Sequence, residues 1–290
     1  MQDSEGYVEI EDNLRLFYRQ VGHGSNAVVI PGASLLSKDF LPLAKTHQLI
    51  FYDSRGRGRS DRDPNPDHIW TDYEVRDLET VRNHFGLDKL TLCGWSYWGG
   101  ISALYASHHP AIVSRLVLIC PISPRSPAPY DDKEGAAQKE QARIDPAAGK
   151  ALREWMKSGR HITEPEKFCR EFQRVITPRQ MGIANAINRM KSDPCSCLNE
   201  WWHHLREHHA LHFPTESRYQ YDWREKIQAI EAPSLIIHGK EDLIPEKSSQ
   251  EWADHLQNGR LFTLEEVGHY PHLEAPEQFF PVVKNFLAAP

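Results

Sequence analysis

The chain has 290 residues, of which 40% are hydrophobic, so it is long enough to bury a large core as one domain or one domain with an insertion. Its net charge of -6 at pH 7 includes no run of like charges, which argues against nucleic acid and anionic membrane surfaces as partners. We therefore expect a small-molecule substrate.

Residues 1–5 (MQDSE) lack the basic start and apolar stretch of a signal peptide, and no apolar run reaches the length of a membrane span. These features predict a cytoplasmic protein. The five cysteines are an odd number scattered along the chain, which predicts free buried thiols rather than a disulfide framework.

Short β-rich runs alternate with helix-length amphipathic segments in the first half, a pattern typical of a mostly parallel sheet with helices on both faces. The clearest helix spans residues 72–85, because Thr71 and Glu74 form a capping box and Gly86 supplies a C-terminal stop. We expect an antiparallel pair of strands and then four buried strands, at residues 7–10, 14–20, 27–30, 49–52, 90–93 and 113–119.

The pattern changes after Cys120. Residues 121–232 are rich in charged residues, histidine, tryptophan and proline, and they have helical periodicity without a strand-like run. The α/β pattern then resumes with strands at 234–238 and 260–264 and helices at 245–256 and 276–287. The sequence therefore predicts an α/β core of residues 1–120 and 233–290, with an eight-stranded, mostly parallel sheet, and a helical cap at 121–232.

Ser96 lies between strand 90–93 and a helix over 101–108, in the segment 94–100 (GWSYWGG). A serine on a sharp strand-to-helix turn projects its hydroxyl above the sheet, and the amide of Tyr97 is left free to stabilise an oxyanion. The second position after such a serine is usually small, and here it is Trp98, so we expect Gly99 and Gly100 to compensate. The simpler alternative is an ordinary serine N-cap.

Asp242 and His269 each follow one of the two late strands, in the chain order nucleophile, acid, histidine. A hydroxyl is a poor nucleophile near pH 7 unless a base removes its proton, and that base works best when a buried acid fixes its tautomer. Glu241 is the rival acid and His272 the rival base. This pattern predicts a catalytic triad of Ser96, His269 and Asp242.

Four features resemble the α/β-hydrolase superfamily: residues 28–33 (VVIPGA), residues 53–61 (DSRGRGRSD), the serine turn, and the late segments bearing Asp242 and His269. The resemblance implies that the amide of Ala33 is the second oxyanion donor, although the family usually has histidine where this chain has Pro31. It also implies structural roles for the arginines of residues 53–61.

Within the superfamily the chain is most similar to the proline iminopeptidase group and its esterase relatives. The GGPG oxyanion loop and the GGSW serine turn of true iminopeptidases are absent. The resemblance therefore does not carry peptidase specificity to this chain.

Aromatic side chains near the serine and in the cap are candidates to line the substrate pocket: Trp95, Trp155, Phe168, Phe172, Trp201 and Trp202. The cap also holds residue types that bind zinc, but no second paired motif completes a site, so we expect no metal. These residues are Cys195, Cys197, His203, His204, His208, His209 and His212.

The leading hypothesis is a serine hydrolase that cleaves an ester-like bond, a carboxylic ester or a lactone, without a cofactor. An aminopeptidase is the alternative enzyme, and it needs a cap carboxylate for the substrate ammonium; the candidates are Glu164, Glu166, Glu171 and Glu200. A ligand-binding protein that keeps the fold without turnover is the third hypothesis, because a fold does not fix function.

Overall fold

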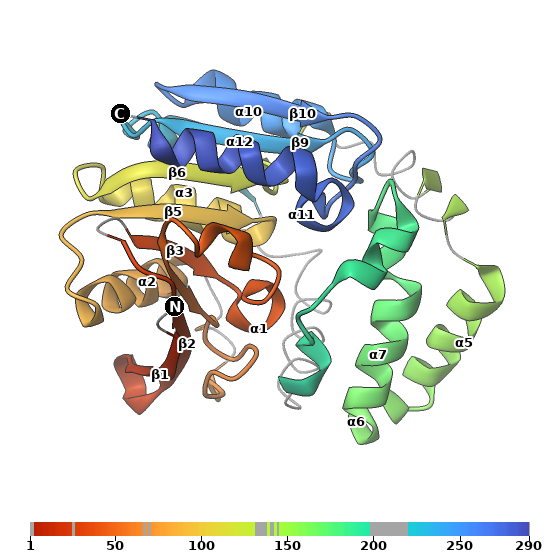
Figure 1. Ribbon diagram of the computed structural model, residues 1–290. Helices are drawn as coiled ribbons and strands as arrows, with labels where there is room; N and C mark the ends of the chain where they lie inside the picture. Colours follow the sequence, from red (N-terminus) through yellow and green to blue (C-terminus); the bar gives the residue numbers. More distant parts are fainter. Residues whose placement is uncertain are drawn as a thin grey trace.

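The computed structural model describes residues 3–24, 27–65, 68, 71–130, 138–139, 142–143, 145–197 and 220–289. These residues contain an eight-stranded sheet of order β1-β2-β4-β3-β5-β6-β9-β10 (Figure 1). β1 pairs antiparallel with β2, which pairs antiparallel with β4, and the remaining neighbours are parallel. The predicted sheet is confirmed. Its strands are β1 (Asp3–Glu9), β2 (Arg15–Val21), β3 (Ala27–Pro31), β4 (Gln48–Tyr52), β5 (Leu90–Trp95), β6 (Val113–Ile119), β9 (Ser234–Gly239) and β10 (Gly259–Leu264).

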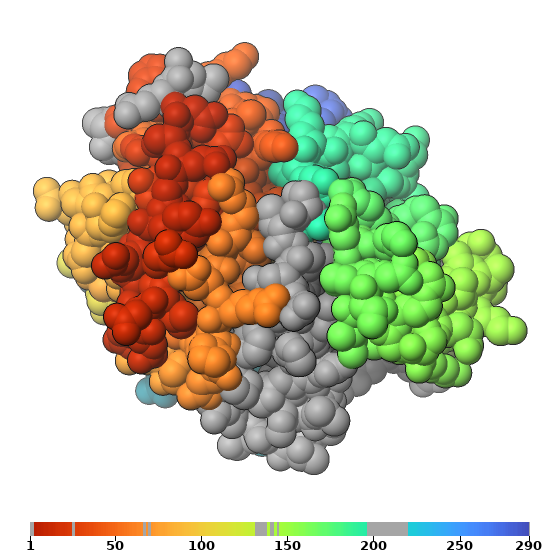
Figure 2. All heavy atoms as spheres, turned by 90° about the horizontal axis from the view of Figure 1, so that it is seen from below, coloured from red at the N-terminus to blue at the C-terminus, as the bar shows by residue number. Residues whose placement is uncertain are grey.

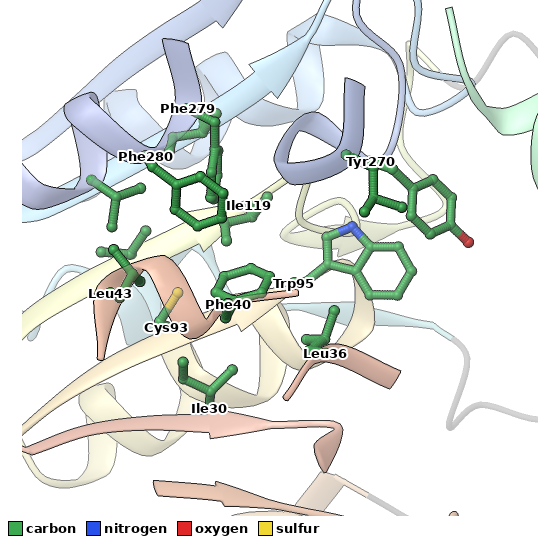
Figure 3. Packing of buried hydrophobic residues seen from close by; sticks show 14 of the residues in the cluster. Ile30, Leu36, Phe40, Leu43, Cys93, Trp95, Ile119, Tyr270, Phe279 and Phe280 are labelled. Carbon is green, nitrogen blue, oxygen red and sulfur yellow. The ribbon is translucent and has the colours of Figure 1, made fainter. Parts of the chain in front are cut away.

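Helices cover both faces of the sheet, and alternate strand residues enter two separate apolar cores. Val28 and Ile30 of β3 face the core that includes residues of α1 and α12, part of which is shown in Figure 3, whereas Val29 faces the core that includes residues of α2, α3, α9 and α10. The helices of the core are α1 (Ala33–Leu36), α2 (Thr71–His84), α3 (Tyr97–His108), α9 (Arg224–Ile227), α10 (Glu246–His255), α11 (Pro271–Glu274) and α12 (Pro276–Ala288), with short 3-10 turns η1 (Glu11–Asn13) and η2 (Leu41–Leu43).

The described part of residues 121–232 is mainly helical, and α5–α7 lie beyond the carboxyl ends of the parallel strands (Figure 1). Figure 2 shows these helices, in green, on the side of the molecule opposite the N-terminal strands, in red. The elements are α5 (Pro146–Lys157), α6 (Arg160–Thr163), α7 (Pro165–Val175), η4 (Thr177–Gln180), η5 (Ala184–Arg189) and η6 (Pro194–Cys197).

The secondary structure of residues 121–232, hereafter the inserted segment, differs from the sequence prediction in one detail. The sequence indicated no strand here, but β7 (Arg125–Ser126) and β8 (Tyr221–Asp222) form a small antiparallel pair where the segment leaves and rejoins the core. Strands this short carry no periodicity, so a pattern search misses them.

Among the described helices, none is both long and apolar enough to cross a membrane.

The expectation of free thiols is wrong for two of the cysteines. Cys169 in α7 and Cys195 in η6 form a disulfide, whereas Cys93 and Cys120 are free and buried as expected. Their separation of 26 residues gave no sign of contact, because only the packing of η6 against α7 brings the two side chains together. Counting cysteines cannot detect such an arrangement.

Because of the disulfide, the denatured protein should have two fewer reactive thiols before reduction than after reduction. Cys195→Ala should abolish this difference and lower the free energy of unfolding by about 3 kcal/mol, the order expected for closing a loop of this size. Thiol titration in denaturant and denaturant unfolding measure the two quantities. Cys93→Ala is the control for the titration, because it removes a free thiol and should leave the difference unchanged.

Candidate active site

Ser96 occupies the sharp turn between β5 and α3, with φ 55° and ψ -122°. A positive φ is strained for a residue with a side chain, and such strain persists only where the surroundings hold it. Here the Ser96 N–H donates to the carbonyl of Ile119 at 2.8 Å, and its own carbonyl accepts from Gly99 N at 3.0 Å. Gly94 permits the turn, because a Cβ there would lie 2.4 Å from the Trp98 carbonyl oxygen.

Trp98 stands where a small residue is usual, and its indole contacts Gly32 and Ser54, which follow β3 and β4. The indole packs so closely on Gly32 that a Cβ there would lie 2.8 Å from the ring, and its Nε1 donates to Ser54 Oγ at 3.0 Å. As the sequence suggested, glycines allow the close packing nearby: a Cβ on Gly99 would lie 3.1 Å from Pro121, and one on Gly100 would lie 2.9 Å from Trp223.

Ala33 begins α1, immediately after Gly32, which adopts a left-handed conformation with φ 93°. Buried Asp53 fixes this helix start, since its carboxylate accepts from Ser34 N at 2.8 Å and from Ser34 Oγ at 2.5 Å. Burial raises the pKa of Asp53, and its hydrogen bonds to Arg59 N and Ser34 oppose that shift. Within the described part of the chain, the amides of Ala33 and Tyr97 have no hydrogen-bond acceptor, as expected for the first residue of a helix.

The arginines of residues 53–61 have structural contacts, in line with the prediction. Arg55 is 1% exposed and pairs with Asp77 at 2.6 Å and Asp63 at 2.9 Å. Arg57 packs over the rings of Tyr97 and Trp98, at 4.9 and 5.4 Å from their centroids. The turn is thus attached both to α2 and to the residues that follow Ser96.

Asp242 and His269 meet at the carboxyl ends of β9 and β10. Asp242 Oδ2 lies 2.7 Å from His269 Nδ1, and the residues are 5% and 6% exposed. The other Asp242 oxygen accepts from Ile244 N at 3.0 Å, which orients the carboxylate. Trp95 Nε1 donates to the His269 carbonyl at 2.7 Å. Because the acid holds Nδ1, Nε2 is the imidazole nitrogen left for a proton transfer.

The rival acid and base have other surroundings. Glu241 is paired with Arg143 at 2.7 Å and its side chain is 42% exposed. His272 is 3% exposed and packs against Phe40, with ring centroids 5.0 Å apart. Burial lowers the pKa of His272 to about 3, so this imidazole stays neutral in an apolar core.

A family model for the alpha/beta hydrolase fold matches residues 30–276. The chain belongs to this family. A proline iminopeptidase of Saccharolobus solfataricus is 26% identical over 283 residues, which cover 93% of this chain and 87% of the relative. A 2-hydroxymuconate semialdehyde hydrolase of Pseudomonas sp. (strain CF600) is 26% identical over 250 residues, which cover 85% of this chain and 78% of the relative.

Solved structures agree on the fold. An alpha/beta fold family hydrolase from Bacillus anthracis superposes with a TM-score of 0.68 at 15% identity, covering 98% of this chain and 99% of that one. The sequence prediction of an α/β-hydrolase superfamily member close to the proline iminopeptidase group is therefore confirmed.

The aromatic candidates of the hydrolase fall into three groups. Trp95 is 7% exposed and packs on His269, with ring centroids 4.9 Å apart. Trp155, Phe168 and Phe172 belong to a small apolar cluster within the inserted segment. Trp201 and Trp202 lie outside the described residues.

The candidate metal ligands of the inserted segment do not form a described site. Cys195 is in the disulfide, the Cys197 side chain is not described, and the five histidines from His203 to His212 lie outside the described residues. A different group does lie together: single ligand atoms of Cys120, Asp242 and His269 fall within 4.8 Å of one another. Burial, and then the Asp242 charge, raise the pKa of the Cys120 thiol well above its usual value.

Two buried carboxylates at the site were missed by sequence reasoning. Glu74 was predicted as part of a capping box, but its carboxylate instead accepts from Ser54 Oγ at 2.8 Å and from Tyr97 OH at 3.0 Å, which attaches α2 to the serine turn. The Glu274 carboxylate accepts hydrogen bonds from the backbone amides on both sides of His269, those of Gly268 and Tyr270. Its only sequence signal was its position shortly after the histidine.

The Asp242–His269 hydrogen bond predicts a large effect of Asp242→Asn. An amide cannot hold His269 in the tautomer that leaves Nε2 free to accept a proton, so hydrolytic turnover should fall by about 10⁴-fold. Glu241→Gln is the matched control, since it changes the neighbouring carboxylate and should leave turnover within about threefold of the parent. Steady-state kinetics on both variants, with circular dichroism to verify folding, make the comparison; equal losses would contradict the choice of acid.

Proposed function

We propose that the protein is a serine hydrolase that cleaves an ester-like bond of a small molecule, a carboxylic ester or a lactone, through Ser96, His269 and Asp242. The observation that carries the proposal is the buried 2.7 Å hydrogen bond between Asp242 and His269 Nδ1, at the same edge of the sheet as the strained Ser96 turn. A protein that only bound a ligand would need neither the strain nor the buried pair, which supports an enzyme over that third hypothesis.

In this mechanism Ser96 Oγ attacks the carbonyl carbon while its proton passes to His269 Nε2. The oxyanion is held by the amides of Ala33 and Tyr97, both at helix starts. His269 then protonates the leaving alcohol, and an acyl-enzyme remains. Water attacks the acyl-enzyme with His269 as base, which releases the acid and restores Ser96. No step requires a cofactor.

The pairing of the cap carboxylates supports an ester over a peptide substrate. An aminopeptidase needs an acidic group free to bind the substrate ammonium, but Glu164 pairs with Arg160 at 2.9 Å and with Lys167 at 2.7 Å. Glu166 pairs with Arg170 at 2.8 Å, and Glu171 with Arg174. Glu200 lies outside the described residues. An ester has no ammonium to neutralise, so it requires no free carboxylate.

The aminopeptidase alternative rests on the relatives. Several similar proteins, including the one from Saccharolobus solfataricus, are named proline iminopeptidase. Others are named for different hydrolytic activities, such as the putative carbamate hydrolase of Pseudomonas savastanoi pv. phaseolicola. The substrate screen below therefore includes both classes.

We also propose that residues 121–232, apart from α9, which packs in the apolar core on the sheet, form a cap over the site. The carbonyl of Gln180 accepts from His269 N at 2.8 Å, so this segment reaches the catalytic histidine. A cap there would shield the acyl-enzyme from bulk water and shape the acyl pocket.

Our proposed location is the cytoplasm, as the sequence suggested, and the Cys169–Cys195 disulfide conflicts with it, because the cytoplasm keeps thiols reduced. Because both cysteines are buried, cells are lysed directly into denaturant that contains an alkylating reagent. Modification of both cysteines without prior reduction supports the cytoplasm, and protection of both contradicts it.

Ser96→Ala should abolish labelling by a fluorophosphonate probe and lower turnover at least about 10³-fold while the protein stays folded. A panel of p-nitrophenyl esters, lactones and aminoacyl arylamides then separates the substrate classes. Turnover confined to prolyl arylamides would favour the aminopeptidase. Labelling that persists in Ser96→Ala would remove the serine from its assigned role.

The cap proposal predicts that aromatic residues of the inserted segment control acyl-chain preference. Trp155 and Phe172 are half-buried members of its apolar cluster, so Trp155→Ala and Phe172→Ala should shift the preferred chain length while the labelling rate of Ser96 changes by less than about threefold. Kinetics with p-nitrophenyl esters of increasing chain length measure the shift. An unchanged preference in both variants would refute their role in specificity.

A further inference from the structure

Glu274 is a buried carboxylate whose partners are all backbone amides. It closes α11, is 2% exposed, and pairs with no arginine or lysine within the described ranges. Oε2 accepts from Gly182 N at 2.8 Å, from Ile183 N at 2.9 Å and from Gly268 N at 2.9 Å. Oε1 accepts from Tyr270 N at 3.0 Å. Burying a charge is costly unless it is hydrogen-bonded, and four amides satisfy this one.

These four amides belong to two segments that are far apart in the sequence. Gly268 and Tyr270 flank the catalytic histidine, whereas Gly182 and Ile183 belong to the inserted segment. The His269 amide makes a further bond, to the carbonyl of Gln180 at 2.8 Å. All three consecutive amides from 268 to 270 are therefore held, two by Glu274 and one by the inserted segment.

The backbones of the two segments pack so closely that only glycine fits at two of the contact positions. A Cβ on Gly182 would lie 2.1 Å from the carbonyl oxygen of Glu266, and one on Gly268 would lie 2.4 Å from that of Gln180. Arg189 Nη1 adds bonds of 2.9 Å to the carbonyls of Leu273 and Glu274, so η5 is also attached to α11. Backbones in such close contact move together.

We propose that Glu274 is a positioning residue: its carboxylate sets the placement of His269 above the sheet and couples that placement to residues 180–183 of the inserted segment. This inference rests on the proposed function, in which His269 is the general base. Glu274 touches neither substrate nor reacting atoms and acts only through the backbone on either side of the histidine.

A carboxylate is suited to this role because it accepts hydrogen bonds and donates none. Hydrogen bonds from N–H groups to an ionised oxygen are about twice as strong as those between neutral groups. Glutamine has nearly the same size, but it replaces one acceptor oxygen by an NH₂ group that would face an amide donor. Glu274→Gln therefore leaves at least one buried N–H without an acceptor and should let the histidine loop shift.

The experiment compares Glu274→Gln with Glu277→Gln, the same change at an exposed position three residues later in the chain. At a temperature where both are folded, we expect Glu274→Gln to lower kcat for a p-nitrophenyl ester and the rate constant of fluorophosphonate labelling by about 10²-fold, with KM changed less than about threefold. The Glu277→Gln variant should match the parent. A purely structural glutamate would lower the melting temperature without slowing the chemistry of the folded protein.

A spectroscopic measurement tests the placement of His269 without any substrate. The imidazole proton shared between His269 Nδ1 and Asp242 gives a low-field proton resonance, which should shift or disappear in Glu274→Gln and persist in Glu277→Gln. An unchanged resonance together with an unchanged labelling rate overturns the proposal. If Glu274→Gln does not fold, Glu274→Asp is the second variant, because it keeps the carboxylate but moves it back by one methylene. We expect Glu274→Asp to slow labelling at least tenfold. An unchanged labelling rate in that variant also overturns the proposal.

The outcomes separate this inference from the proposed function. Absence of labelling and of turnover in the parent protein would contradict the serine hydrolase, whatever Glu274 does. An active parent whose Glu274 variant is equally active would contradict only the positioning role.

Discussion

The parallel pairing of β3, β5, β6, β9 and β10 is the constraint on which the site depends. Because parallel strands end at one edge of the sheet, residues that follow different strands meet there although the chain separates them widely. Ala33 follows β3, Ser96 follows β5, and Asp242 and His269 follow β9 and β10. Helices α5–α7 of the inserted segment lie beyond the same edge (Figure 1). The proposed mechanism therefore invokes only groups at this edge of the sheet.

Buried carboxylates join the loops at this edge through backbone amides. Asp53 holds the start of α1 through Ser34 N, and Asp39 accepts from the amides of Lys191 and Ser192, which attaches the inserted segment to the loop after α1. Glu274 does the same around His269. Side chains that bond to backbone fix a loop whatever its own side chains are, and the low dielectric of the interior strengthens each bond. The loop after α1 and the loop that carries His269 are therefore both attached to the inserted segment.

The serine turn combines strain with rigid support. Ser96 keeps a positive φ because the carbonyl of Ile119 and the amide of Gly99 hold it, and the neighbouring glycines let β5 and α3 approach closely. Trp98 adds a link that a small residue cannot, since its indole packs on Gly32 and bonds to Ser54. In this chain the loop that begins α1 and the serine turn are in direct contact, so a shift of one must displace the other.

The sequence by itself determined the α/β pattern and the order of Ser96, Asp242 and His269, because hydrophobic periodicity marks strands and each of these residues follows one. The sequence favoured Asp242 but left Glu241 as a rival. Only the tertiary structure shows which of the two side chains faces His269 and which meets Arg143, distant in the chain. The sequence also did not predict the Cys169–Cys195 disulfide or the backbone amides that bind Glu274. It predicted a helix cap for Glu74, whose carboxylate instead accepts a hydrogen bond from Tyr97 in the serine turn. Each of these contacts joins elements that are far apart in the sequence. Their approach depends on tertiary packing, which a local pattern of residues does not specify.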